Sequence, residues 1–306
     1  MHFTVEHPLG QHGCAPELSG PHGVAAVASA AEQYGFDAIA FTEHPAPPRA
    51  WVDKGGHPSM DPLIALAFCA AVTRRIKLLT HLVVLPYHAP LALAKAVATT
   101  DRLSSGRLIL GVGSGYLRAE FDALGVDFEH RSTRFDEALH TLRTVWTDNE
   151  FSYKGGDFEA CSVVSEPGPT QLPHPPLWIG GTSRAARRRV ARAGEGWMPL
   201  LMSARLAQAT RSASIGTPEE LAVAIRDLKE LVHREGRDPE AIQVQVYSSH
   251  STIDGADFSA AEHLDYLGRL AAAGANWFVV RPSAAGVTEC CDSMAAYDDE
   301  VISNMR

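Results

Sequence analysis

Short apolar segments alternate with helical segments from one end of this chain to the other, and this alternation constrains the fold more than any other feature. The apolar segments are typical of strands that are covered on both faces, as in a parallel sheet. Strands that alternate with helices in this way predict a single (β/α)8 TIM barrel of the α/β class. The eight predicted strands are residues 2–6, 36–42, 76–85, 108–110, 177–179, 196–201, 243–247 and 277–280.

Helical periodicity fills most of the sequence between these strands. The predicted helices cover residues 23–34, 62–72, 90–103, 117–124, 131–146, a stretch from 182 or 183 onward, 217–236, 260–272 and 287–302. Segment 151–175 breaks the alternation and predicts an irregular insertion with hairpin-like turns between strands four and five. Because 306 residues suit one barrel and no shift in composition marks a boundary, we expect one domain over residues 1–306.

Charge and cysteine content disfavour several classes of protein. The chain has 27 basic and 36 acidic residues and no dense Lys/Arg block, which argues against nucleic-acid binding. Its five cysteines are odd in number and lack CxxC spacing, so reduced thiols in a cytoplasmic protein are expected. The longest clean apolar run, residues 63–72, is too short to span a bilayer, and no export signal is visible.

A glycine-rich stretch, GVGSG at residues 111–115, follows the fourth strand. Glycine lets the backbone lie directly against a ligand, so this loop is predicted to contact one. A dinucleotide fingerprint should instead close the first strand of a βαβ unit, and these glycines come about 110 residues into the chain. A Rossmann-type nucleotide site is therefore not expected.

In TIM barrels the active site is built at the carboxyl ends of the strands. The residues at those positions are therefore the candidates for a ligand site at one end of the barrel. They are Glu6 and His7, Glu43 and His44, 81–86, 111–115, 180–184, 199–202, 248–250 and Arg281. The structural alternatives are a capping role for His44, core packing for His81 and an ion pair for Arg281.

Two long segments resemble a known family. Residues 61–139 (DPLIALAFCAAVTRRIKLLTHLVVLPYHAPLALAKAVATTDRLSSGRLILGVGSGYLRAEFDALGVDFEHRSTRFDEAL) and 173–200 (PHPPLWIGGTSRAARRRVARAGEGWMPL) resemble the bacterial luciferase-like monooxygenase superfamily. Within it, the chain is most similar to the coenzyme F420-dependent oxidoreductases typical of actinobacteria. FMN-dependent members share the barrel and several of these signatures.

The resemblance implies where a cofactor would bind. His44, preceded by the acidic Glu43 at the end of strand two, would lie beside the deazaflavin ring, and a non-prolyl cis peptide around Thr80, His81 and Leu82 would back it. The strand-four loop would follow the ring and the ribityl chain, through Gly111, Gly113, Ser114 and Gly115. Helix N-terminal amides and a guanidinium would meet the phosphate, through Gly180, Gly181, Thr182, Ser183 and Arg184. Helical spacing predicts surface positions for Arg187 and Arg189.

Two positions depart from the sugar-phosphate dehydrogenases of this group. Pro48 and Ser114 stand where those enzymes have a Trp and a Glu that act as acid and base, so oxidation of glucose 6-phosphate is not expected. His44 and Glu6 are the remaining candidates for proton transfer, and His44 is preferred because imidazole titrates near neutral pH.

The resulting hypothesis is an oxidoreductase that uses F420 for hydride transfer to or from a small organic substrate. A homodimer through the helices after strands two and three is what the resemblance implies. One alternative is an FMN-dependent luciferase-like monooxygenase, and a second is a non-catalytic flavin-binding barrel. Candidate apolar pocket residues, with core packing as the alternative, are Trp51, Met60, Trp197 and Met202.

A metal-dependent hydrolase is disfavoured, and no metal site is expected. His2 and His7 are five positions apart, which is not the HxH pair that usually begins such a site on the first strand. Glu43 and His44 are neighbours on a strand and point to opposite faces, so they form a poor chelating pair.

Overall fold

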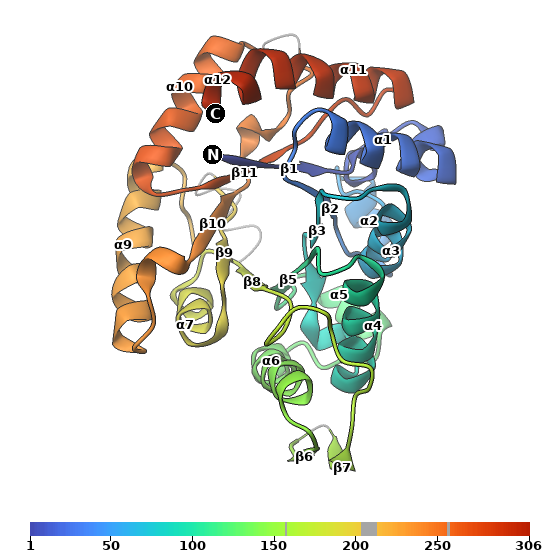
Figure 1. Ribbon diagram of the computed structural model, residues 1–306, viewed down its shortest axis with the longest axis vertical. Coiled ribbons are helices and arrows are strands. Elements are labelled where there is room, and N and C mark those ends of the chain that lie inside the picture. The colour runs from blue at the N-terminus through green and yellow to red at the C-terminus, as the bar shows by residue number, and fades with distance from the viewer. Residues whose placement is uncertain (157, 203–212, 256–257) are drawn as a thin grey trace.

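A closed parallel sheet organises the computed structural model, which describes residues 1–156, 158–202, 213–255 and 258–306 (Figure 1). Its strand order is β3-β2-β1-β11-β10-β9-β8-β5-β4, and an additional β3–β5 pairing closes the barrel. This confirms the predicted (β/α)8 fold. The strands are β1 (His2–Glu6), β2 (Ala38–Phe41), β3 (Lys77–Thr80), β4 (Val83–Val84), β5 (Leu108–Gly113), β8 (Leu177–Gly180), β9 (Gly196–Met198), β10 (Gln243–Val246) and β11 (Trp277–Val280).

Helices surround the barrel and cover its outer face (Figure 1). Two predicted helix starts are confirmed by capping hydrogen bonds, because the backbone N–H of Ile64 donates to the Asp61 carboxylate and that of Glu220 to the Thr217 hydroxyl. No helix among the described residues is long and apolar enough to cross a membrane. The α-helices are α1 (Pro21–Gln33), α2 (Arg49–Val52), α3 (Pro62–Val72), α4 (Pro90–Leu103), α5 (Arg118–Ala123), α6 (Arg131–Thr147), α7 (Arg184–Ala193), α9 (Pro218–Arg234), α10 (Ala260–Ala273), α11 (Val287–Tyr297) and α12 (Ser303–Met305).

Shorter elements complete the described chain. The insertion forms an antiparallel hairpin that projects from the barrel, with strands β6 (Phe151–Lys154) and β7 (Glu159–Val163). Asp157, within the same insertion, lies outside the described residues. The 3-10 turns are η1 (Pro8–Gly10), η2 (Pro16–Ser19), η3 (Leu85–Tyr87), η4 (Pro239–Ala241) and η5 (Ser249–Ser251), and η6 (Asp298–Ile302) is a π-helical turn.

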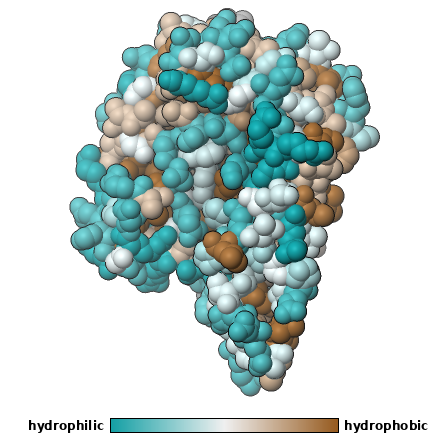
Figure 2. Space-filling view, viewed as in Figure 1, coloured by the Kyte–Doolittle hydropathy of each residue, from teal (hydrophilic) through white to brown (hydrophobic). Residues whose placement is uncertain are grey.

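The barrel strands are buried on both faces, which explains their nearly continuous apolar sequences. Outward side chains join the helices in the main core. A separate cluster of buried residues comes from strands all around the sheet: Ala38, Ala40, Leu79, Ile109, Trp178, Met198 and Trp277. On the outside, Figure 2 shows hydrophilic residues over most of one face, with smaller hydrophobic patches between them.

The third predicted strand, residues 76–85, is divided in the structure. The peptide bond between His81 and Leu82 is cis, as the family resemblance implies, and it lies in the gap between β3 and β4. β3 pairs with both β2 and β5, whereas β4 pairs with β5 alone. Two short strands therefore occupy one barrel position.

The glycine-rich stretch also differs from the prediction. Gly111 and Gly113 belong to β5 and not to the loop after it. A Cβ on Gly111 would lie 2.0 Å from the carbonyl oxygen of Thr80, so glycine is needed here for the close approach of two strands. The loop proper begins beyond Gly113, and Gly115, with φ of +72°, is its residue in the left-handed region.

Candidate active site

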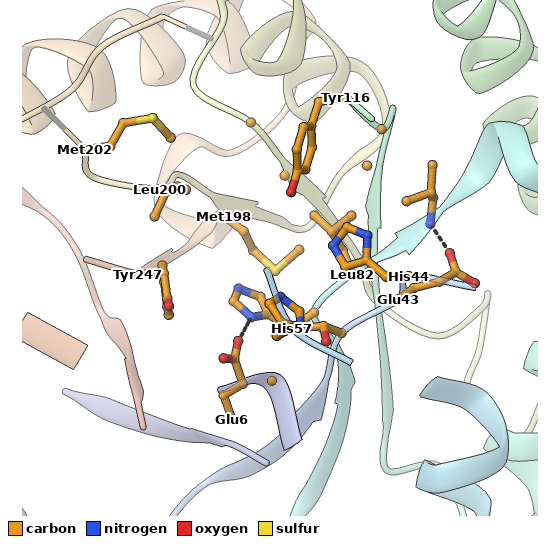
Figure 3. A pocket seen from close by; sticks show the side chains of 18 of the residues that line it. Glu6, Glu43, His44, His57, Leu82, Tyr116, Met198, Leu200, Met202 and Tyr247 are labelled. Carbon is orange, nitrogen blue, oxygen red and sulfur yellow. Dashed lines mark hydrogen bonds and ion pairs between the residues drawn. The ribbon is translucent and has the colours of Figure 1, made fainter. Parts of the chain in front are cut away.

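A cavity of about 640 Å³ opens at the carboxyl ends of the barrel strands, a size typical of small-molecule sites. Side chains reach it from strand ends that are far apart in sequence, including Glu6 from β1, His44 after β2 and Arg281 after β11. Most of the strand-end positions predicted to form one ligand site therefore contribute to one cavity (Figure 3). His7 and residues 248–250 do not line it, because His7 is buried against Phe41 and the segment after β10 turns into η5.

Leu82 forms part of the cavity wall between two glycines. A Cβ on Gly113 would lie 2.4 Å from one Leu82 methyl carbon, and a Cβ on Gly180 would lie 2.3 Å from the other. Real Cβ atoms do not approach this closely, so both positions need glycine to accommodate Leu82 where it is. The resulting wall combines a branched apolar side chain with glycine backbone, which suits a flat aromatic ring.

A second cavity of about 200 Å³ adjoins the first. It reaches the start of α7, where the N–H of Ala186 donates to the Ser183 hydroxyl, and it is flanked by Arg131 and Arg189. Helix N-terminal amides and guanidinium groups favour an anion, so a ligand with a flat head and an anionic tail fits the two cavities together. The lining residues that the cavities share are Ser114, Gly115, Tyr116, Gly180, Gly181 and Thr182.

Arg184 is expected at the anionic end from the sequence, but the structure places it outside both cavities. Its exposed side chain lies 3.9 Å from the Asp227 carboxylate on α9. Arg189 instead points toward α6, where it bonds Asp136 and lines the second cavity. Five positions along a helix are not a whole number of turns, so these two arginines face different neighbours. The predicted surface positions of Arg187 and Arg189 are wrong, because each side chain is only 14% exposed. Arg131 is a further cavity residue that sequence reasoning missed.

Glu6 is at the centre of a charged cluster on the main cavity. Its carboxylate lies 2.9 Å from Nδ1 of His81 and 3.5 Å from Nε of Arg281. Burial raises the pKa of Glu6, but the hydrogen bond from His81 and the positive charge of Arg281 outweigh burial and hold that pKa below its usual value. Glu6 is therefore ionised at neutral pH and acts only as an acceptor.

Tyr247 completes this cluster from the end of β10. Its hydroxyl accepts a hydrogen bond from Arg281 at 3.0 Å. Burial, together with the negative charge of Glu6, raises the pKa of Tyr247 to about 12. The phenol stays protonated at neutral pH, so its O–H can donate to a ligand in the cavity.

His44 lies on the cavity wall and is held by a carboxylate that sequence reasoning missed. Nδ1 of His44 is 3.1 Å from Glu120, whose side chain is completely buried. Glu120 also accepts from the N–H of Ala46 and the hydroxyl of Tyr87. In the sequence, Glu120 is marked only as an acidic residue next to the apolar Phe121 in a short predicted helix. This pattern is too common to identify Glu120 as a site residue.

Aromatic rings surround His44. The ring centroid of Trp51 lies 4.6 Å away, and those of His57 and Tyr116 lie at 5.2 and 6.1 Å. The candidate pocket residues of the sequence thus divide between two environments. Trp51 contacts His44 and Met202 lines the main cavity, whereas Trp197 is fully buried and donates to the Gly181 carbonyl, and Met60 packs against the core.

Glu43 lines the main cavity, but its carboxylate is engaged by the protein. One oxygen accepts from the N–H of Val84 at 2.6 Å, and the other lies 2.9 Å from Nε2 of His88. These bonds attach the segment after β2 to β4 and to the end of η3. Thr80 and Gly111 line neither cavity, because the Thr80 hydroxyl donates to the Gly111 carbonyl at 2.7 Å within the sheet.

Two histidines of the main cavity are each paired with a single carboxylate. His81 contacts Glu6, and His44 contacts Glu120. In the part of the chain that the structure describes, no three His, Cys, Asp or Glu residues are arranged so that they could hold a metal ion.

Comparison with known proteins finds relatives over most of the chain. A family model described as luciferase-like monooxygenase matches residues 1–277. An uncharacterised protein of Mycobacterium tuberculosis is 33% identical over 213 residues, which cover 65% of this chain and 72% of that protein. An FMNH2-dependent dimethylsulfone monooxygenase of Pseudomonas putida is 34% identical over 128 residues, or 41% of this chain and 35% of that enzyme.

A solved structure shares the whole fold. The coenzyme F420-dependent tetrahydromethanopterin reductase of Methanopyrus kandleri has a TM-score of 0.76 and 16% identity, over 100% of this chain and 99% of that one. Proteins similar to this chain thus include one named for F420 and one named for FMNH2.

Proposed function

Because this chain belongs to the luciferase-like monooxygenase family, we propose that it is an oxidoreductase that uses coenzyme F420 for hydride transfer to or from a small organic substrate. One observation supports hydride transfer above all: two histidines, each paired with a buried carboxylate, face the cavity that also holds the ring-compatible wall. When a hydride leaves or joins a carbon bonded to oxygen or nitrogen, a proton must leave or join that oxygen or nitrogen. A histidine paired with a carboxylate can accept or donate this proton.

In this proposal the cofactor extends through both cavities. Leu82, the backbone from Gly113 to Gly115, and Gly180 would face its ring, with His44 beside it. The backbone near Gly181 and Thr182, the cap at Ser183 and the guanidinium of Arg131 would surround the phosphate.

The remaining cofactor-site candidates would hold the cavity wall in place without touching the cofactor. Glu43 would fix β4, and Thr80 and Gly111 would fix the strand pair beneath Leu82. A bound deazaflavin supplies a ring carbon that accepts or donates a hydride. The protein would orient the substrate, exclude water and hold the proton. Of the two sequence candidates for this role, His44 can hold it, whereas the ionised Glu6 would act through its partner His81.

FMN-dependent monooxygenation is the alternative, since a relative carries that activity in its name. Reduced FMN reacts with oxygen, whereas a deazaflavin has carbon in place of the reactive ring nitrogen and mainly transfers hydride. A non-catalytic flavin-binding barrel is the second alternative. The wall at Leu82 suits either ring, so the choice depends on binding and turnover.

The test is a parallel titration of the purified protein with oxidised F420 and with FMN, followed by tryptophan fluorescence. Trp51, beside His44, and Trp197, bonded to Gly181, are positioned to report on the cavity. Micromolar binding of F420 with much weaker binding of FMN is expected. The reverse preference would identify a flavin enzyme, and binding of neither would favour the non-catalytic barrel.

We also propose that the chain forms a homodimer through α3 and α4. Ile64, Phe68 and Val72 recur at helical spacing on α3 and are exposed, and Leu103 at the end of α4 is also exposed. An apolar stripe of this kind is typical of a protein interface. Light scattering of the wild type should give twice the chain mass, and Phe68→Asp should give a monomer; a monomeric wild type would contradict the proposal.

A further inference from the structure

We propose that His81 is the catalytic residue that exchanges a proton with the substrate, that Glu6 orients it, and that the substrate is therefore an apolar alcohol or the corresponding carbonyl compound. This inference rests on the proposed function and deepens it, because it concerns the substrate side of the same cavity. His44 then remains a residue beside the cofactor ring and not the proton acceptor.

The protonation pattern of His81 follows from its partner. Glu6 is ionised and can only accept, so the 2.9 Å contact requires Nδ1 of His81 to donate its N–H (dashed line from Glu6 in Figure 3). In the neutral imidazole the other nitrogen, Nε2, then carries a lone pair. His81 lines the cavity, so this lone pair is available to a substrate hydroxyl.

Charged and titratable groups reach the surroundings of His81 from several elements. Glu6 comes from β1, Tyr247 from the end of β10 and Arg281 from the end of β11, and His57 follows α2. The ring centroids of His81 and Tyr247 are 5.8 Å apart. The Tyr247 hydroxyl accepts from Arg281, so its own hydrogen can be donated to the substrate oxygen.

An acceptor and a donor therefore face the same space. A hydroxyl oxygen placed there can give its proton to Nε2 of His81 while it accepts a hydrogen bond from Tyr247. A carbonyl oxygen can accept from Tyr247 and from a protonated His81. Met198, Leu200 and Met202 supply apolar surface for the hydrocarbon attached to that carbon (Figure 3).

The position of His81 next to the ring-compatible wall favours it as the proton acceptor. His81 immediately precedes Leu82, the side chain of the ring-compatible wall. In alcohol oxidation the hydride leaves the carbon and the proton leaves its attached oxygen, so the hydride acceptor and the proton acceptor must be adjacent. His44 is instead enclosed by Trp51, His57 and Tyr116.

The step balances without a further reactant. The O–H bond breaks and its proton goes to Nε2 of His81, the C–H bond breaks and its hydride goes to oxidised F420, and the C=O bond forms. Two electrons leave the alcohol with the hydride. Carbonyl reduction is the same step in reverse, with reduced F420 as the hydride donor and protonated His81 as the proton donor.

The first test needs neither cofactor nor substrate. Nitrogen-15 NMR of the histidine-labelled protein, assigned by comparison with His81→Asn, reports which ring nitrogen carries the proton. We expect the Nδ1–H tautomer in the wild type and a mixture of tautomers in Glu6→Gln. An Nε2–H tautomer in the wild type would overturn the inference.

The second test uses the F420-bound enzyme and a series of primary and secondary alcohols from ethanol to cyclohexanol, with the matching carbonyl compounds and reduced F420 for the reverse direction. His81→Asn should retain F420 affinity within about threefold, lose about 10²-fold or more in kcat and change the pH profile of kcat/KM. Added imidazole should partly restore His81→Gly. His250→Gln, an exposed histidine stacked on Tyr266 outside both cavities, is the matched control and should match the wild type.

The outcomes separate the two proposals. If the protein does not bind F420, the proposed function fails, whatever the tautomer of His81. If it binds F420 but turns over no member of the series in either direction, or if His81→Asn keeps full activity and its pH profile, the assignment of His81 and of the substrate class is overturned while the cofactor assignment stands.

Discussion

Nδ1 of His44 and the carboxylate of Glu120 lie 3.1 Å apart, although 76 residues separate them in the chain. Glu120 comes from α5, the helix that follows the glycine-rich loop, and His44 follows β2. The hydrogen bond therefore joins two parts of the cavity wall, and Glu120 also accepts from Ala46 and Tyr87. His44 is held by a buried acceptor and not by solvent.

Glu120→Gln should destabilise the protein and disturb the His44 side of the site. The glutamine amide keeps one acceptor oxygen, but its NH2 group would face the three groups that now donate to Glu120, from His44, Ala46 and Tyr87. About 1–3 kcal/mol of unfolding free energy should therefore be lost. Urea unfolding measures this, and F420 affinity should fall in parallel. Glu129→Gln, at an exposed ion pair with Arg118, is the control and should leave stability nearly unchanged. Equal effects of both substitutions would contradict a special role for Glu120.

Gly113→Ala should reduce cofactor binding, because the added methyl group would meet Leu82 at 2.4 Å and force it toward the cavity. Overpacking of this kind costs about 1–3 kcal/mol. Binding of F420 should weaken about tenfold or more, and a second substitution, Leu82→Ala, should recover part of the lost stability. Gly268→Ala, on the exposed side of α10 with open space around it, should be neutral or slightly stabilising. Unchanged F420 affinity in Gly113→Ala would show that Leu82 does not face the ring.

Arg131→Gln should weaken binding of a phosphate-bearing cofactor, whereas Arg184→Gln should not. Arg131 lines the second cavity, and Arg184 faces Asp227 outside it. We expect a loss of about tenfold in affinity for the first variant and little change for the second, with the difference largest at low salt because screening weakens charge interactions. Titration with FMN and with riboflavin, which lacks the phosphate, separates a charge effect from a packing effect. A larger effect of Arg184→Gln would instead support the expectation from the sequence that Arg184 meets the phosphate.

Stability should fall as the pH decreases from about 6.5 to about 4. Burial lowers the pKa of His7 and of His263 to about 4, so in this window the unfolded chain binds protons that the folded chain does not. Each group should cost about 1.4 kcal/mol per pH unit. His263→Gln can keep a hydrogen bond to the Tyr297 hydroxyl but cannot take up a proton, so it should reduce the stability difference between pH 7.5 and pH 5 by about 2 kcal/mol. An unchanged difference in urea unfolding would show that His263 titrates normally in the folded protein.

Local patterns in the sequence determined the class of fold and the end of the barrel that carries the site. Continuous apolar strands, helical periodicity and caps such as Asp61 and Thr217 are short-range signals, and each depends on residues only a few positions apart. Once these predict a barrel, topology alone brings Glu6, His44 and Arg281 to one end. The one-domain organisation and the homodimer remain predictions.

Only the tertiary structure decided which side chains are partners. Glu6 with His81 and His44 with Glu120 are each 75 or 76 residues apart, and no periodicity connects them. Arg184 and Arg189 both lie on α7, but they point in different directions around the helix axis. Arg184 therefore lies near Asp227, and Arg189 lines the second cavity. Hydrogen bonds and ion pairs act over a few ångströms in space, so their chemistry depends on distances that only the closed barrel establishes.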